Sequence, residues 1–287
     1  MPGSALEARK VTFRYEDGTK ALDEISLDIP EDKKVAVLGP NGAGKSTLFL
    51  HFNGILKCDE GSILFRGSEI SHRKKDLKKL RRKVGIVFED PDSQLFSGSI
   101  YQEISFGPSN IGLSDEEVRR RVRRSMEITD IEDLSDKSTH LLSFGQKKMV
   151  SIASIIAMEP EVIIFDEPTA GLDPARANQI VDFLDRLNER GTTVIMSTHD
   201  VNLAYSWADY CFLLNEGKKT AEGRPEDLFR NDNLLEEVNL EKPGVLEIFE
   251  SLKGTDLVNE NGSPRNKGEL IRMIERNSSE LSKPEES

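Results

Sequence analysis

The residues Gly39-Pro-Asn-Gly-Ala-Gly-Lys-Ser46 match the pattern G-x-x-x-x-G-K-[ST] of a phosphate-binding loop. The apolar run Val35 to Leu38, which predicts a buried strand, lies directly before them, and a helical pattern from Lys45 to Phe52 follows. Glycines allow successive backbone N–H groups to face one point, and the N-terminus of a helix adds partial positive charge there. The stretch therefore predicts nucleotide binding in an α/β fold. Kinases, GTPases, helicases and transport motors all share such a loop.

Other apolar runs extend this prediction to a parallel sheet. Val84 to Phe88, Val162 to Phe165 and Val194 to Met196 are continuously apolar, as in strands covered on both faces, and helical patterns separate them. The segments Val11 to Tyr15 and Ile25 to Ile29 alternate apolar and polar residues, which predicts antiparallel strands. We therefore expect a parallel core sheet joined to an antiparallel β subdomain.

The rest of the chain predicts mostly helices. A helical subdomain is expected at about 89–158, with helices at Asp115 to Thr129 and Lys147 to Met158 and a loop from Gly107 to Leu113. Residues 1–230 would then form the nucleotide-binding domain, and 231–276 a C-terminal helical extension whose last helix runs from Gly268 to Arg276. Residues 277–287 are expected to be a disordered tail.

Composition excludes several classes of protein. The 287 residues carry 39 Lys and Arg against 51 Asp and Glu, a net charge of -12, which disfavours general nucleic-acid binding. Basic residues concentrate at Arg73 to Lys83 and Arg119 to Arg124, which suggests either a protein or lipid contact or solvated helix faces. No apolar run is long enough to span a bilayer, and two cysteines make no disulfide framework; since no apolar segment follows basic residues near Met1, we expect no secretory signal.

Chemically active side chains follow each predicted parallel strand. Lys45 is expected to reach the β- and γ-phosphates, and the Ser46 hydroxyl to ligate Mg²⁺. Asp166 is expected to hold Mg²⁺ through its water shell, while Glu167 accepts a proton from the attacking water or orients it. Glu89 follows the strand Val84 to Phe88, and His199 follows the strand ending at Met196. Because ligands bind beyond the carboxyl ends of parallel strands, these groups point to one site.

The segment Leu142-Ser-Phe-Gly-Gln146 resembles the signature motif of ABC-type ATPases, usually Leu-Ser-Gly-Gly-Gln. The resemblance covers about Leu6 to Gly223 and includes Ala170-Gly-Leu-Asp173 at the D-loop. Within that family, Phe88 to Phe96, followed by Phe106-Gly-Pro108, resembles the ATPase subunits of energy-coupling-factor importers of the cobalt/nickel type. The resemblance thus implies a P-loop NTPase fold that hydrolyses ATP.

The resemblance also implies roles for individual residues. Tyr15 stands where the adenine-stacking aromatic falls, Glu89 where the Mg²⁺-ligating switch glutamine falls, and His199 where the switch histidine falls. The catalytic residues implied are Glu167, His199 and Glu89, and the Mg²⁺ ligands are Ser46, Glu89 and Asp166. The residues implied to bind nucleotide are Tyr15, Gly39, Pro40, Asn41, Gly42, Ala43, Gly44, Lys45, Ser46, Thr47, Ser143, Gly145 and Gln146.

The partners follow from the same resemblance. The chain would pair as a homodimer, or as a heterodimer with a second ABC ATPase, so that Ser143 and Gly145 of one protomer complete the ATP site of the other. The pair would act at the cytoplasmic face of the cell membrane with a transmembrane coupling protein and a substrate-binding membrane subunit, and without nucleic acid.

Two residues depart from the family pattern. Glu89 replaces the usual glutamine, which adds negative charge near the phosphates, and Phe144 replaces a glycine of the signature. Two alternatives therefore stay open: an ATP-gated switch subunit of low activity that pairs with a competent ATPase, and a soluble ABC ATPase acting on nucleic acid or ribosomes. The 97 residues between Lys45 and Ser143 leave no space for the long coiled-coil arms of the chromosome-maintenance type.

Overall fold

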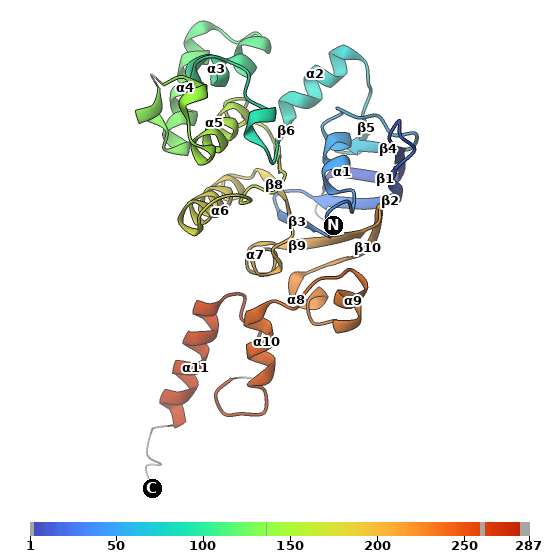
Figure 1. Ribbon diagram of the computed structural model, residues 1–287, viewed down its shortest axis with the longest axis vertical. Coiled ribbons are helices and arrows are strands. Elements are labelled where there is room, and N and C mark those ends of the chain that lie inside the picture. The colour runs from blue at the N-terminus through green and yellow to red at the C-terminus, as the bar shows by residue number, and fades with distance from the viewer. Residues whose placement is uncertain (1–2, 136, 259–261, 282–287) are drawn as a thin grey trace.

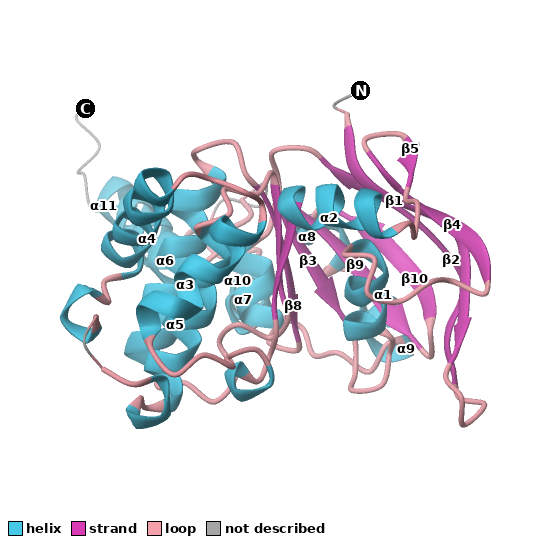
Figure 2. Ribbon diagram, turned by 90° about the horizontal axis from the view of Figure 1, so that it is seen from above, coloured by secondary structure: helices cyan, strands magenta, loops and turns pink. Residues whose placement is uncertain are grey.

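Two β-sheets and a helical lobe form the frame of the structure (Figure 1), a computed structural model that describes residues 3–135, 137–258 and 262–281. Figure 2 shows most helices gathered on one side and the strands of both sheets on the other. No helix within these residues is long and apolar enough to cross a membrane.

The larger sheet has the strand order β10-β9-β3-β8-β7-β6. The five strands β9, β3, β8, β7 and β6 run parallel to one another, which confirms the predicted parallel sheet. The sixth strand, β10, pairs with β9 in the antiparallel sense. β9 is a fifth parallel strand beyond the four predicted. The bounds are β3 Lys34–Leu38, β6 Val84–Val87, β7 Val162–Phe165, β8 Thr193–Thr198, β9 Tyr210–Asn215 and β10 Lys218–Gly223.

The antiparallel sheet has the order β2-β1-β4-β5, with β1 Ser4–Arg14, β2 Lys20–Pro30, β4 Glu60–Phe65 and β5 Ser68–Glu69. Its first two strands are about twice as long as predicted. Lys10 and Glu24 have positive φ, and the register of β1 against β2 shifts between Ala8 and Val11. Such a bulge interrupts the alternation of apolar and polar residues along the strand. The alternation in the sequence therefore predicts only the half of β1 that follows the bulge.

Helices cover both faces of the larger sheet. Leu48, Phe49 and Phe52 of α1 (Lys45–Phe52) belong to an apolar cluster that also contains alternate strand residues of both sheets. The opposite face packs against α6 (Pro174–Asn188) and α7 (Val201–Trp207). The predicted basic segment forms α2 (Lys74–Lys83), on which only Leu80 is buried, as expected for a solvated face.

The helical lobe consists of α3 (Ile100–Asn110), α4 (Asp115–Thr129) and α5 (Phe144–Ile156), with short 3-10 turns η1 (Pro91–Ser93), η2 (Glu132–Leu134) and η3 (Thr139–Leu141). It has its own apolar core. The loop predicted at Gly107 to Leu113 is wrong in its first half, because α3 continues through Pro108 to Asn110. Gly107 lies against Met158, and the chain leaves the helix at Gly112, whose φ is +84°. A proline in the last turn removes only one helical hydrogen bond.

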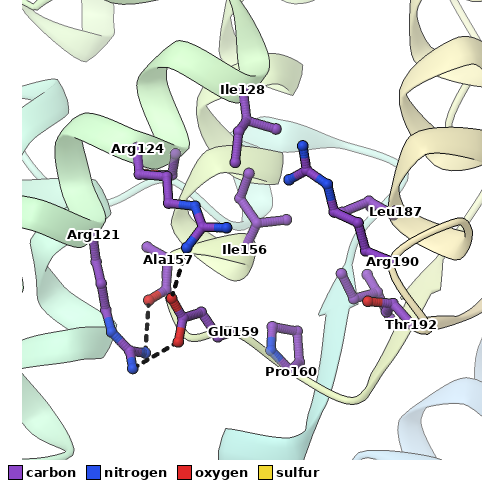
Figure 3. A pocket seen from close by; sticks show the side chains of 12 residues that line it. Arg121, Arg124, Ile128, Ile156, Ala157, Glu159, Pro160, Leu187, Arg190 and Thr192 are labelled. Carbon is purple, nitrogen blue, oxygen red and sulfur yellow. Dashed lines mark hydrogen bonds and ion pairs between the residues drawn. The ribbon is translucent and has the colours of Figure 1, made fainter.

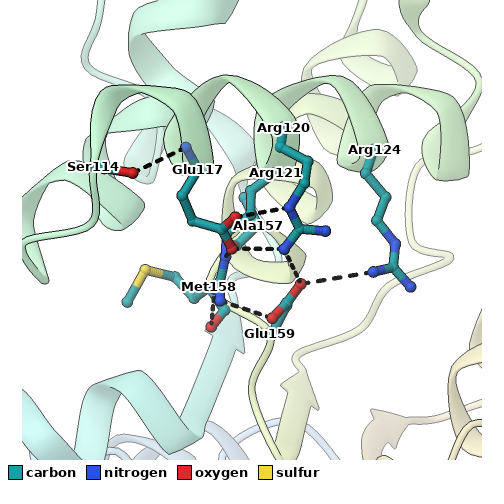
Figure 4. A network of polar contacts seen from close by, with 8 residues as sticks. All are labelled: Ser114, Glu117, Arg120, Arg121, Arg124, Ala157, Met158 and Glu159. Carbon is teal, nitrogen blue, oxygen red and sulfur yellow. Dashed lines mark hydrogen bonds and ion pairs between the residues drawn. The ribbon is translucent and has the colours of Figure 1, made fainter.

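A polar network fastens the lobe to the core (Figure 4). Arg121 of α4, with a side chain 10% exposed, pairs with Glu117 at 2.8 Å and Glu159 at 2.8 Å. Its guanidinium also donates to the carbonyls of Ala157 and Met158, each at 3.3 Å. The network thus ties α4 to the connection between α5 and β7.

A cavity of about 260 Å³ lies beside this network, between α4, the end of α5 and the turn after α6. Arg124 and Arg190 lie on either side of it, and its wall includes Ile128 and Ile156 (Figure 3). The seam between lobe and core is therefore not closely packed at this point, and the ion pairs of Arg121 lie along its edge.

The C-terminal segment contains α8 (Pro225–Leu228), α9 (Asp232–Glu237), α10 (Gly244–Ser251) and α11 (Lys267–Leu281). Leu246, Phe249 and Leu270 join the core cluster of α6 and α7. Arg265 donates to the backbone oxygens of Tyr205 and Ala208, at 2.6 and 2.5 Å. The last helix runs five residues past its predicted end at Arg276, since neither Gly nor Pro follows Gly268 before residue 284; residues 282–287 of the predicted tail lie outside the described part.

Candidate active site

The phosphate loop joins β3 to α1 and is held by close backbone contacts. Gly39 approaches β9 so closely that an added Cβ would lie 2.1 Å from the backbone oxygen of Leu214. Gly44 has a φ of +98°, and its Cβ would lie 2.6 Å from the oxygen of Ala21. Side chains are therefore excluded at both positions, and the loop is supported by strands on two sides. Ala43 is buried, while Asn41, Gly42 and Ser46 are exposed.

Lys45 lies over this loop with a residue exposure of 7%. Its Nζ donates to the carbonyls of Gly39 at 2.7 Å and Pro40 at 3.2 Å. Burial lowers the pKa of Lys45, and the charges of the carboxylates of Glu167, Asp166 and Glu89 oppose that lowering. The ends of β6 and β7 thus bring three acids near one ammonium group, as the sequence predicts.

Asp166 and Glu167 are connected through Ser197 of β8. The Ser197 hydroxyl donates to Asp166 Oδ1 at 2.6 Å and accepts the backbone N–H of Glu167 at 2.8 Å. Both acids are more than nine-tenths buried. The pair is therefore held in place from the neighbouring strand rather than by the turn that follows it.

Glu167 has two features that structural acids seldom combine. Its φ is +43°, a strained backbone conformation for a residue with a side chain. Its Oε2 lies 3.1 Å from Nδ1 of His199, but its buried Oε1 has no hydrogen-bond partner within the described part of the chain. An unpaired buried carboxylate oxygen is costly, so this atom is poised to receive a hydrogen-bond donor such as water.

Tyr15 lies at the end of β1 beside α1. Its hydroxyl is 2.9 Å from Thr47 Oγ1, and its ring packs edge-on against Phe13. The side chain is held at one end, while 40% of the residue stays exposed. The contact links two predicted nucleotide-binding residues, and adenine stacking remains a prediction.

The signature residues have local roles at the start of α5. The Ser143 hydroxyl accepts the backbone N–H of Gln146 and the Gln146 side chain accepts that of Ser143, which is a capping box. Gly145 lies against Arg176, where an added Cβ would be 2.2 Å from Nη1. The Phe144 ring packs on Gly171, so the departure from glycine is accommodated against the D-loop.

The signature and the phosphate loop stay separate in one chain. Among the described residues, no hydrogen bond or ion pair joins Ser143, Gly145 or Gln146 to residues 39–47. The structure therefore brings together the predicted site residues at the ends of β3, β6, β7 and β8. The signature residues at the start of α5 make no such contact with the phosphate loop.

The donors predicted for Mg²⁺ fit that ion. Ser46, Glu89 and Asp166 offer only oxygen atoms, which Mg²⁺ prefers. In the part of the chain that the structure describes, no three His, Cys, Asp or Glu side chains gather closely enough to form a dedicated metal site. Mg²⁺ takes few protein ligands and completes its shell with phosphate and water.

Sequence reasoning missed the residues that support the acids. Lys148 on α5 is fully buried, and its ammonium group meets the ends of β6 and β7. Half-buried Gln94 hydrogen-bonds to the backbone of Phe88 and Ser151. Buried Ser197 hydrogen-bonds to the backbone N–H of Glu167. A signal for Lys148 was present, since it shares the buried face of α5 with Ser151 and Ile152.

Comparison with known proteins gives a consistent result. The family model described as "ABC transporter" matches residues 22–170. An "Energy-coupling factor transporter ATP-binding protein EcfA" from Methanococcus maripaludis is 47% identical over 88% of this chain and 90% of its own. A "Putative ABC transporter ATP-binding protein" from Methanosarcina mazei is 45% identical over 94% of this chain, which spans only 59% of that relative.

Solved structures agree. The cbiO1 protein of Clostridium perfringens, described as part of the ABC transporter complex cbiONQ, has a TM-score of 0.74 and 44% identity, covering 86% of this chain and 99% of that one. A dimeric ATP-binding cassette, MJ0796, bound to ADP and phosphate after hydrolysis, has a TM-score of 0.71 and 28% identity, covering 77% and 98%.

Proposed function

The chain belongs to the ABC transporter family of ATP-binding proteins, and from this we propose that it is the ATP-hydrolysing subunit that powers an importer of the energy-coupling-factor type. The observation that carries the proposal is the state of Glu167: its backbone is strained, its side chain is buried, one carboxylate oxygen lies beside His199, and the other has no hydrogen-bond partner among the described residues. Beside it, Lys45 and the phosphate loop offer a cradle for a triphosphate.

The proposed reaction assigns a task to each group. The amides of the phosphate loop and Lys45 bind the β- and γ-phosphates, and Tyr15 stacks on the adenine. Glu167 Oε1 orients a water molecule toward the γ-phosphorus and accepts its proton, while His199 holds the carboxylate at its other oxygen. Ser46, Glu89 and Asp166 would hold Mg²⁺, which would neutralise negative charge on the phosphates.

Two such ATPase chains would close around the nucleotide, as a homodimer or with a second ABC ATPase. The separation of Ser143 from the phosphate loop within one chain supports this arrangement, as does the likeness to the dimeric MJ0796 cassette. Ser143 and Gly145 of one copy would then contact the γ-phosphate held by Lys45 of the other. Hydrolysis followed by release of phosphate would remove the charge that both halves bind, so the pair would open.

The opening would be passed to membrane subunits. The relatives named as EcfA proteins and the cbiO1 protein of the cbiONQ complex support a transmembrane coupling protein and a substrate-binding subunit as partners. We propose that the chain works at the cytoplasmic face of the membrane. Its cargo would be cobalt, nickel or another micronutrient.

Phosphate release from Mg²⁺-ATP tests the proposal. Glu167→Gln keeps the shape of the side chain but removes the proton acceptor, so we expect the rate to fall by about 100-fold or more. ATP binding should persist, since the phosphate loop is unchanged. The control is Glu189→Gln, an exposed glutamate at the end of α6, which should behave like the wild type. Equal rates for the wild type and Glu167→Gln would refute the assignment, and wild-type dimers that hold ATP without hydrolysing it would favour a switch subunit.

A further inference from the structure

Lys148 is a fully buried lysine whose ammonium group meets three backbone oxygens. Its Nζ donates to the carbonyl of Glu89 at 2.6 Å and to that of Phe88 at 3.2 Å, and makes a longer contact of 3.5 Å with that of Glu167. The exposed fraction of the residue is 0%. Since an ammonium group has three N–H donors, these contacts occupy all of its capacity.

The electrostatic surroundings explain how a lysine persists at this depth. Burial lowers the pKa of Lys148 to about 8, and the charges of Glu89, Asp166, Asp90 and Glu167 act in the opposite direction. The group therefore lies among the acids proposed to act on ATP. Lys148 donates to the backbone carbonyls of Glu89 and Glu167, and it makes no hydrogen bond to their carboxylates among the described residues.

Gln94 reinforces the same connection. Its Oε1 accepts the backbone N–H of Phe88 at 3.1 Å, and its Nε2 donates to the carbonyl of Ser151 on α5, also at 3.1 Å. Gln94 and Lys148 thus both attach the segment after β6 to α5. Lys148 alone also reaches β7, at the carbonyl of Glu167.

We propose that Lys148 is a positioning residue for ATP hydrolysis, which fixes the backbone of Glu89 and Glu167 against α5. The inference rests on the proposed function. In that function Glu89 and Glu167 act on the nucleotide of their own chain, whereas Ser143 at the start of α5 acts on the nucleotide of the second chain. Lys148 therefore joins, within one rigid unit, the parts that one chain contributes to two ATP sites.

The neighbouring Lys147 provides a matched control. It lies on the same helix, but its Nζ pairs at 2.5 Å with Asp92, whose side chain is 61% exposed. Lys147→Met and Lys148→Met remove the same atoms from adjacent positions. Only the second change leaves the carbonyls of Glu89 and Glu167 without their buried donor.

The first test measures backbone hydrogen exchange of the full-length protein without nucleotide. We expect Lys148→Met to speed exchange at least tenfold in 88–94 and 166–170, where the amides of Phe88, Glu167 and Ala170 are hydrogen-bonded. Lys147→Met should leave both segments at the wild-type rate. Unchanged exchange in Lys148→Met, or an equal change in Lys147→Met, overturns the inference.

The second test measures steady-state ATP hydrolysis. Lys148→Met should lower kcat at least tenfold with KM within threefold of the wild type, because the phosphate loop is untouched. A wild-type kcat in this variant overturns the positioning role. A wild-type protein without any Mg²⁺-dependent hydrolysis would refute the proposed function instead, and the exchange comparison still decides the role of Lys148.

Lys148→Gln covers the case in which the methionine variant does not fold. Glutamine supplies two N–H donors on a shorter, uncharged side chain. We expect faster exchange in the same two segments and a kcat at least threefold below the wild type at unchanged KM. Wild-type values of both quantities would overturn the proposal.

Discussion

Replacing Ser197 with alanine should destabilise the fold through one deleted hydroxyl. Ser197 has an exposed fraction of 0%, and its hydroxyl bonds to Asp166 Oδ1 at 2.6 Å and to the N–H of Glu167 at 2.8 Å. A hydrogen bond to a charged group contributes about 1.5–3 kcal/mol, and a buried N–H left unpaired costs about 1–3 kcal/mol. Asp166 and Glu167 are 7% and 8% exposed, so water replaces the lost bonds poorly. We expect Ser197→Ala to lower the free energy of unfolding by about 2–4 kcal/mol.

Urea denaturation provides the assay, since Trp207 is the single tryptophan and is buried, so its fluorescence reports unfolding. Ser251→Ala is the control, because that exposed hydroxyl donates to the carbonyl of Ile248 within its own helix; it should change the free energy by less than about 0.5 kcal/mol. In an Asp166→Ala background, Ser197→Ala should cost about 1–2 kcal/mol less than in the wild type, since the bond between the two side chains is already gone. A loss no larger than that of the control would refute the reasoning.

Two further predictions concern stability. Arg121→Leu should lower the free energy of unfolding by about 1–3 kcal/mol, because it leaves two partly solvated glutamates and two carbonyls without a buried guanidinium. The control is Arg123→Leu, at an exposed position of the same helix. Equal losses for the two variants in urea denaturation would contradict the role of the network. Burial lowers the pKa of His51, whose Nε2 is buried and unpaired among the described residues. As the pH falls, His51 therefore binds a proton in the unfolded chain at a higher pH than in the folded chain. The free energy of unfolding should then decrease as the pH drops below about 6.5. His51→Phe should show a shallower fall between pH 7.5 and 5.5 in thermal unfolding, and an unchanged slope would exclude His51 as a source.

The parts of this protein that the sequence by itself determined are those encoded within a few neighbouring residues. The phosphate loop, the apolar strands and the acids at their ends are contiguous patterns. The geometry of a parallel sheet then brings the strand ends to one edge whatever the strand order. For this reason the sequence alone predicts the α/β fold and places Lys45, Asp166 and Glu167 at one site.

The tertiary structure alone decided what holds those residues in place. Lys148 lies 59 and 60 residues from its acceptors after β6, and Ser197 lies 31 residues from Asp166, so no local pattern reports these bonds. The same holds for the bulge that lengthens β1 and for the packing that lets α3 continue through Pro108. Such features depend on which buried surfaces meet after folding. In such buried places a polar group is costly unless a residue far along the chain supplies its hydrogen bond.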